Sequence, residues 1–194
     1  MCILYFYFWS VSVLVILQSL RVTTVQLEAM FLAPLDKHSA KLLQVIRNKG
    51  GRVKEQTTRT LKVLDETVDI TMKREAVFKS QINLGEPVEN LVKECQDVQE
   101  NIQHQLETMA IFVIRREDPF HPLKDKTIVI DGAQVLTDVP SVATAVAMFF
   151  GLIYALTLKY PKHLQYTLEC IQKVLMELGG KKMSSKVHKL STLV

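Results

Sequence analysis

The chain has 194 residues, with 24 lysines and arginines against 20 aspartates and glutamates, a net charge of +4 and an apolar fraction of 48%. This length allows a buried core, and the composition excludes a disordered tail, a collagen-like chain and a small disulfide-bonded scaffold. The net charge alone is too low to indicate a nucleic-acid-binding protein. Cys2, Cys95 and Cys170 lie too far apart for a disulfide framework or a zinc-ligand spacing, which indicates a reducing compartment.

Charge is unevenly distributed along the chain. The net charge is 0 over residues 1–20, +5 over 21–80, −5 over 81–120 and +4 over 121–194. The basic and acidic blocks can pair within one chain or between chains, or form solvated helix faces.

The first twenty residues, MCILYFYFWSVSVLVILQSL, carry no charged side chain. A helix of this length is about 30 Å long, so residues 1–20 are a candidate membrane anchor, with the N-terminus outside and the remainder of the chain in the cytoplasm. They fit a secretory signal poorly, because no basic residue precedes them and no small-residue cleavage site follows. The alternatives are a soluble packing element and a gene-model artefact, since codons with T at the first or second position can encode every residue up to Leu17 and Gln18 follows.

Residues 26–106 are predicted to be a helical region. Asp36 is a candidate N-cap for its first helix, which Gly50-Gly51 would end. Apolar residues recur at helical spacing within and after that helix, at Ala40, Leu43, Ile46, Leu61, Leu64 and Val68. Gly85-Glu86-Pro87 interrupts the pattern, and Pro87 is well placed to start another helix.

After this interruption, a long apolar stripe at i, i+3, i+4 and i+7 spacing predicts an amphipathic helix. Its members are Val88, Leu91, Val92, Cys95, Val98, Ile102 and Leu106. Together with the preceding helix it predicts a helical hairpin or a short coiled coil. Because a long apolar stripe is rarely left in water, it is also a candidate partner-binding surface, formed by Val88, Leu91, Cys95, Val98 and Ile102.

Arg47, Lys49, Arg52 and Lys54 form a compact basic cluster and are candidate contacts to phosphate groups. The sequence between Phe31 and Phe78 holds no aromatic residue on which bases could stack, and the glycine spacing is not that of a phosphate-binding loop. We therefore favour a solvated turn between helices for this cluster.

Residues 107–194 are predicted to form a small α+β domain. The apolar run from Met109 to Ile114 predicts a buried strand. Residues 127–130 and 133–136 are β-prone, and the Asp131-Gly132 pair between them is typical of a type I′ hairpin turn. Asp138 and Pro140 then predict the start of a helix that reaches Leu158.

This helix holds no charged residue, so hydropathy alone would make residues 140–158 a membrane span. Its small residues recur every four positions, at Ala143, Ala147, Gly151 and Ala155. The hairpin before it and an amphipathic helix after it offer packing surfaces, and we therefore favour a buried central helix.

Two further helices are predicted after Pro161. The first has an apolar stripe of Leu164, Leu168, Ile171, Leu175 and Leu178, and Gly179-Gly180 would end it. The second would be capped by Ser184 and carry Val187, Leu190 and Leu193. The predicted fold is thus mostly helical α+β: a helical hairpin or coiled-coil middle, then a strand, a β-hairpin and three helices.

Residues 151–190 resemble the C-terminal region of vertebrate proteins called sterile alpha motif domain-containing protein 3-like. The resemblance rests on GLIYALTLKYPK, from Gly151 to Lys162, and on QKVLMEL, from Gln172 to Leu178, with a strand and hairpin like residues 109–136. It covers about 85 residues and implies a cytosolic or nuclear protein without a span at 140–158. The sterile alpha motif itself is not recognisable in this chain, so oligomerisation through that motif is not implied.

No sequence motif indicates catalysis. The histidines, at positions 38, 104, 121, 163 and 188, form no close ligand pair, and nucleophile-elbow, dinucleotide-binding and C-x-x-C motifs do not occur. Cys95 and Cys170 are interpreted as small core residues.

We therefore predict a protein that is not an enzyme and has no cofactor or metal site. The favoured function is a protein-interaction module, with a protein partner or self-association, in the cytoplasm or nucleus. The alternatives are a single-pass membrane protein with a cytoplasmic domain and, more weakly, a nucleic-acid-associated remnant that uses Arg47, Lys49, Arg52 and Lys54.

Overall fold

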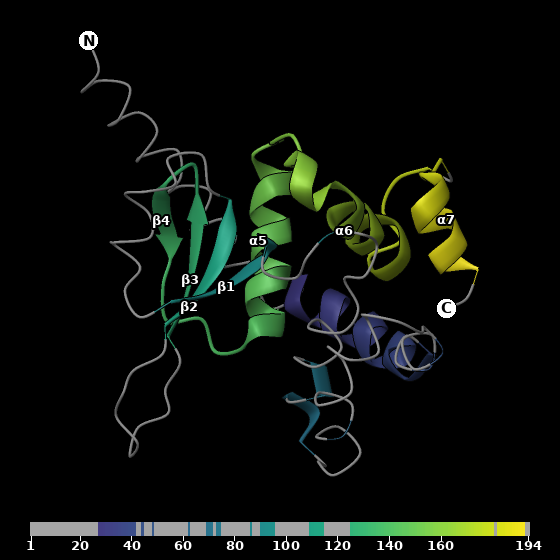
Figure 1. The fold of residues 1–194 in the computed structure, drawn as a ribbon, viewed down its shortest axis with the longest axis horizontal. Helices are drawn as coiled ribbons and strands as arrows, with labels where there is room; N and C mark the ends of the chain where they lie inside the picture. Colours follow the sequence, from purple (N-terminus) through teal and green to yellow (C-terminus); the bar gives the residue numbers. More distant parts are fainter. Residues whose placement is uncertain are drawn as a thin grey trace.

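The computed structural model has three layers: a four-stranded sheet, a central helix named α5, and a group of helices on the far side of α5 (Figure 1). The residues described are 27–41, 44, 48, 62, 69–71, 73–74, 86, 90–95, 109–114, 125–180 and 182–192. This arrangement confirms an α+β fold.

The sheet is mixed, with strands in the order β1-β2-β3-β4. Its strands are β1 (Val92–Cys95), β2 (Ala110–Ile114), β3 (Asp125–Ile130) and β4 (Ala133–Leu136). β1 is parallel to β2, whereas β3 is antiparallel to both of its neighbours. The predicted strand over 109–114 and the predicted hairpin are therefore confirmed. The turn residues Asp131 and Gly132 have φ angles of 50° and 74°, as a type I′ turn requires.

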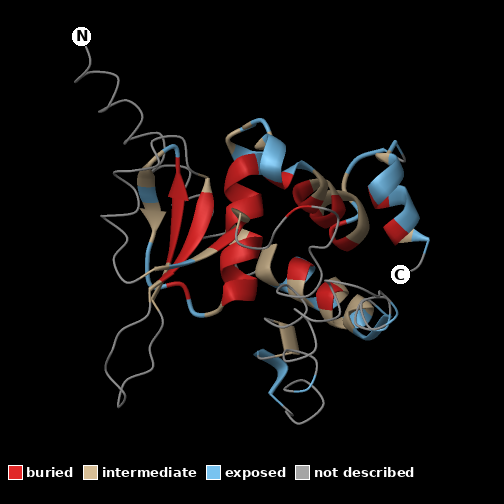
Figure 2. Cartoon of the chain, viewed as in Figure 1, coloured by how far each residue is buried: buried red, intermediate tan, exposed pale blue. Residues whose placement is uncertain are grey.

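Apolar residues on the two faces of the sheet enter two different clusters. Ile111, Val113, Ile128 and Ile130 belong to the main core, which includes α5. Ala110, Phe112 and Val129 alternate with them and form a second, smaller buried cluster on the opposite face. β2 and β3 are therefore buried on both faces, as Figure 2 shows.

β1 corrects the prediction of a continuous helix from Val88 to Leu106. Residues 92–95 form a strand whose register places Lys93 opposite Phe112 of β2, and Ile111 donates a backbone hydrogen bond to the Leu91 carbonyl at 2.8 Å. The helical spacing is misleading here because β1 has only four residues, two on each face of the sheet. So short an alternation of faces is hidden within the longer helical pattern of apolar residues. The predicted helical hairpin or coiled coil is therefore wrong at residues 92–95, while Val88, Val98, Ile102 and Leu106 lie outside the described residues.

α5 (Val142–Ala155) is the buried central helix that we predicted. It lies between the sheet and the other helices and is buried along most of its length (Figure 2). Its N-cap is Ser141, whose hydroxyl accepts a hydrogen bond from the Thr144 N–H at 3.0 Å, and not Asp138. Among the described residues, no helix has both the length and the apolar character needed to cross a membrane.

Two backbone hydrogen bonds at the C-terminus of α5 show why this helix ends before Leu158. The Thr157 N–H donates to the Tyr154 carbonyl at 3.2 Å, and the Leu158 N–H donates to the Ile153 carbonyl at 2.9 Å. This pair of bonds is a Schellman motif, in which the residue at C′ adopts a left-handed conformation. That residue is Thr157, with a φ of 52°.

The stripe predicted after Pro161 is confirmed as a core-facing surface. It runs through a 3₁₀ turn, η2 (Lys162–Leu164), then α6 (Gln165–Cys170) and a π-helical turn, η3 (Ile171–Leu175). Leu164, Leu168, Ile171 and Leu175 are all buried, whereas Leu178, the last predicted member, lies beyond the end of the helix and is partly buried. The helix ends at Leu175, earlier than the predicted end at Gly179-Gly180. Glu177, two residues after Leu175, has a φ of 52°, a left-handed conformation through which a right-handed helix does not continue.

α7 (Ser185–Ser191) is capped by Ser184, as predicted, and buries Val187 and Leu190. Leu193 lies outside the described residues.

A helix over residues 27–41 packs beside α5 (Figure 1). Phe31 and Leu35 are fully buried in the main core, and a Cβ atom on Gly151 of α5 would overlap with Cδ2 of Leu27. This close contact shows why a small residue stands at position 151. The main core thus combines residues of the predicted helical region, 26–106, with residues of the predicted α+β domain, 107–194.

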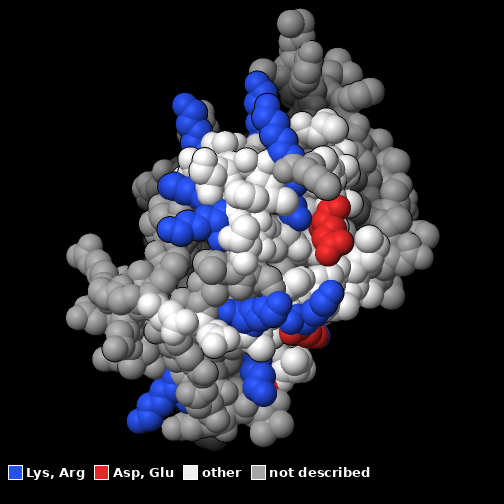
Figure 3. Space-filling model, turned by 90° about the vertical axis from the view of Figure 1, so that its right-hand side faces the viewer, with Lys and Arg blue, Asp and Glu red and all other residues white. Residues whose placement is uncertain are grey.

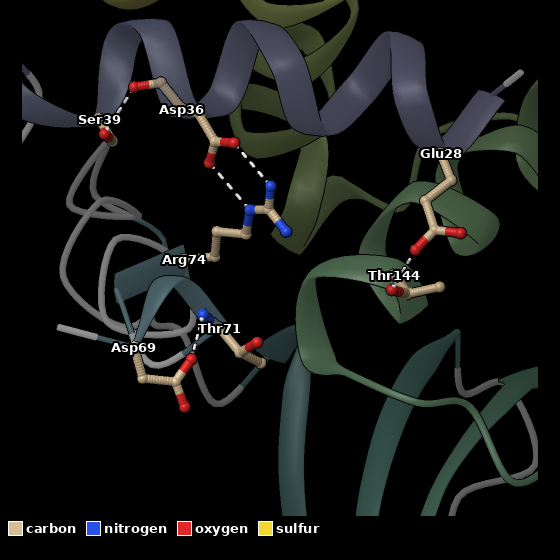
Figure 4. A network of polar contacts seen from close by, with 7 residues as sticks. All are labelled: Glu28, Asp36, Ser39, Asp69, Thr71, Arg74 and Thr144. Carbon is tan, nitrogen blue, oxygen red and sulfur yellow. Dashed lines mark hydrogen bonds and ion pairs between the residues drawn. The ribbon is translucent and has the colours of Figure 1, made fainter. Parts of the chain in front are cut away.

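Asp36 is not an N-cap, because the helix already begins upstream of it and continues past Pro34. Its carboxylate instead accepts two hydrogen bonds from the Arg74 guanidinium, at 2.8 and 2.6 Å, while Glu28 accepts one from the Thr144 hydroxyl at 2.8 Å (Figure 4). These contacts attach the helix to α5 on one side and to residues 73–74 on the other.

Candidate interaction surface

The partner-binding stripe predicted from the sequence does not form an exposed surface where it is described. Leu91 is fully buried in the main core, so it cannot contact a partner, and Cys95 is half-buried beside Phe112 and Val129. Val88, Val98 and Ile102 lie outside the described residues, as do the predicted phosphate contacts Arg47, Lys49, Arg52 and Lys54.

Cys170 is a core residue, as expected from its place on the apolar stripe. It is 5% exposed, and burial raises the pKa of its thiol to about 12. At neutral pH the thiol is therefore protonated and a poor nucleophile. In the described part of the chain, no group of three His, Cys, Asp or Glu side chains is placed to hold a metal ion.

The charged surface that the structure does assemble lies on the helices at the C-terminal end. Four residues at helical spacing, Lys162, Tyr166, Glu169 and Lys173, lie along η2, α6 and η3. The segment leading into α7, and α7 itself, supply three more lysines, at 182, 186 and 189. We call the five lysines, Lys162, Lys173, Lys182, Lys186 and Lys189, the lysine face.

Three polar contacts join the stripe on α6 and η3 to the segment that contains α7. The Lys173 ammonium donates to the Gly180 carbonyl at 3.0 Å, and the Ser184 N–H donates to Glu169 Oε1 at 2.6 Å. The Lys186 ammonium lies 4.3 Å from the ring centroid of Tyr166, within cation–π range. The contacts occur in reverse order along the two segments, so they align the start of α7 with α6.

α6 is itself held in place by a distant carboxylate. Glu86 is buried, and its Oε1 accepts a hydrogen bond from the Tyr166 N–H at 2.9 Å. Its Oε2 accepts two more, from the Thr167 N–H at 2.8 Å and from the Thr167 hydroxyl at 2.7 Å. These N–H groups belong to the first turn of α6, where backbone donors have no partner within the helix. Glu86 therefore acts as a cap supplied from another part of the chain.

The lysine face is exposed and has little opposing charge. Lys162, Lys182, Lys186 and Lys189 are exposed, and Lys173 is half-buried. The acidic residues in these segments are Glu169, whose carboxylate accepts a hydrogen bond from the Ser184 N–H, and Glu177, which is exposed. Figure 3 looks onto this side of the molecule, where lysine and arginine side chains are spread more widely than acidic ones. The surface is therefore positively charged and lies on helices fixed to the core.

Sequence reasoning did not identify the lysine face. A signal was present: residues 156–194 hold seven lysines, no arginine and only two acidic residues. The lysine face forms one surface only because α7 lies against α6. That placement depends on contacts between residues 7 to 20 positions apart in the sequence. A sequence pattern does not show such contacts.

Comparison with known proteins adds no relative. No protein-family model, no curated protein and no solved structure matches this chain.

Proposed function

We propose that the chain is a protein-interaction module and that its partner binds the lysine face. The observation that carries this proposal is the placement of these lysines on η2, η3, α7 and the segment before α7, which three polar contacts hold together. Because three polar contacts hold these helices together, their backbone loses little conformational freedom when a partner binds, and this favours recognition.

The apolar residues of α7 support the same proposal. Val187 and Leu190 are used in the core, so α7 offers a polar, charged side to the outside. Partner contacts through such a side would be mainly electrostatic, which favours fast and reversible association.

The proposal is tested with the tagged full chain and two variants of equal charge change. The first is Lys162→Gln, Lys182→Gln and Lys189→Gln on the lysine face. The matched control is Lys37→Gln, Lys41→Gln and Lys62→Gln, three exposed lysines elsewhere in the described structure. Proteins captured from a cell extract are quantified by mass spectrometry for all three chains.

We expect a set of proteins that the wild type and the control retain and that the lysine-face variant loses. If all three chains retain the same proteins in the same amounts, the lysine face is not the partner surface and the proposal is wrong.

A further inference from the structure

We propose that the partner of the lysine face is an acidic protein segment, a stretch rich in Asp and Glu. This inference rests on the proposed function and specifies the chemistry of the same surface. Its first support is charge complementarity: five lysines lie on this face, against two acidic residues, Glu169 and Glu177, in the same segments.

The lysines of this face are not equivalent. Lys186 is placed over Tyr166, and Lys173 is bonded to the Gly180 carbonyl, so both contribute to the α6–α7 contact. Lys162, Lys182 and Lys189 are exposed and lie around this contact. They are therefore the residues best placed to meet carboxylates of a partner, and they can be changed without removing a contact described above.

The residue types favour carboxylates over nucleic acid. Residues 156–194 contain no arginine, the side chain that binds phosphate with two parallel hydrogen bonds. Their two aromatic residues are Tyr160 and Tyr166. The Tyr160 hydroxyl donates to Gln172 Oε1 at 3.1 Å, and the Tyr166 ring lies beneath the Lys186 ammonium. Both rings are partly buried and pack against the main core, whereas single-strand binding needs aromatic rings on which bases can stack.

The test uses the full chain and fluorescence anisotropy with three labelled probes: a poly-glutamate peptide, a glycine-serine peptide of the same length, and a short duplex DNA. The test variant is Lys162→Glu, Lys182→Glu and Lys189→Glu. The charge-matched control is Lys37→Glu, Lys41→Glu and Lys62→Glu, and circular dichroism confirms that each variant is folded. If the test variant unfolds, the corresponding glutamine substitutions replace it, with glutamine substitutions also in the control.

We expect poly-glutamate to bind the wild type at low salt and the glycine-serine peptide not to bind. The test variant should weaken poly-glutamate binding about tenfold or more, the control about threefold or less, and about 0.5 M salt should weaken wild-type binding because it screens exposed charges. Equal affinities of the two variants, or no poly-glutamate binding by the wild type, would overturn the inference. Tighter binding to duplex DNA that the test variant loses would overturn it too, in favour of nucleic acid.

The two experiments fail in different ways. If the capture experiment depends on the lysine face but poly-glutamate does not bind, a protein partner exists and only its acidic character is wrong. If the capture experiment shows no dependence on the lysine face, the proposed function itself is wrong, whatever poly-glutamate does.

Discussion

Glu86 lies at the first turn of α6, where its Oε2 accepts hydrogen bonds from both the backbone N–H and the hydroxyl of Thr167, 81 residues further along the chain. A carboxylate at this position satisfies donors that the helix leaves open and interacts favourably with the helix dipole. Because Glu86 is buried, a water molecule cannot take over its role as hydrogen-bond acceptor unless the surrounding side chains move. The position of α6, and with it the lysine face, therefore depends on a residue remote in sequence.

We expect Glu86→Ala to destabilise the fold by about 2–4 kcal/mol, because buried N–H groups then lose their acceptor. Glu86→Gln retains one acceptor oxygen and should cost less, about 1–2 kcal/mol. Thr167→Val removes only the hydroxyl bond and serves as the reference. Urea denaturation of the full chain measures all three, and a wild-type midpoint for Glu86→Ala would contradict this role of Glu86.

Thr157 offers a stabilising substitution. Its φ of 52° places a β-branched side chain in the left-handed region, which costs about 1–2 kcal/mol for a residue other than glycine. Thr157→Gly should therefore raise the free energy of unfolding by about 0.5–1 kcal/mol after the greater flexibility of glycine in the unfolded chain is subtracted.

Thr157→Ala is the matched control for this substitution, because alanine keeps the Cβ atom that causes the strain. Both variants also lose the hydrogen bond from the Thr157 hydroxyl to the Leu156 carbonyl. Thermal unfolding should then rank glycine above alanine, and the reverse order would show that residue 157 is not strained.

The contact between Leu27 and Gly151 predicts a coupled pair of substitutions. Gly151→Leu should destabilise the fold by about 1–3 kcal/mol, because added bulk displaces the helix over residues 27–41 from α5. Leu27→Ala in the same chain should recover part of this loss, since it removes the side chain that the new one meets.

A double-mutant cycle measured by urea denaturation gives the coupling energy between positions 27 and 151. Additive effects of the two substitutions would contradict the contact, even if Gly151→Leu alone is destabilising.

Cys170 predicts a loss of stability at alkaline pH. Burial raises the pKa of its thiol from 9.0 to about 12, so the folded state holds this proton where the unfolded state releases it. As the pH rises from 9 towards 12, this thiol therefore favours unfolding, by up to about 1.4 kcal/mol per pH unit. Below pH 9 the thiol is protonated in both states and makes no contribution to pH dependence.

Cys170→Ala is the appropriate control because it removes this titration, although it also leaves a small cavity. Its free energy of unfolding should fall less steeply than that of the wild type between pH 9 and about 11. Parallel pH profiles of the two chains would show that Cys170 does not hold its proton in the folded state.

The parts of the fold that follow from local sequence were predicted. The type I′ turn requires positive φ angles that Asp131 and Gly132 adopt easily, and Ser184 caps α7 through a side chain three residues from its partner. The stripe from Leu164 to Leu175 is local in the same sense, because neighbouring turns of one helix define it.

The parts that were missed depend on long-range contacts. The strand β1 exists because β2 is available as a parallel neighbour, and the helix over residues 27–41 continues past Pro34 with Phe31 and Leu35 packed in the core. The carboxylate of an aspartate can either cap a helix or form an ion pair. Asp36 forms an ion pair with Arg74, which is 38 residues away in the sequence and lies beside it only in the folded chain. The lysine face was missed for the same reason, since α7 must first be placed against α6.

The composition of the main core also bears on how the protein is made. Phe31, Leu35 and Leu91 share this core with residues from Val142 to Leu190. During translation, these three side chains leave the ribosome well before α5, α6 and α7 have been synthesised. These apolar side chains therefore stay exposed until α5, α6 and α7 have emerged, and an exposed apolar segment is prone to aggregate. We expect the core to fold only after these helices have been synthesised, and newly made chains to depend on chaperones that bind exposed apolar segments.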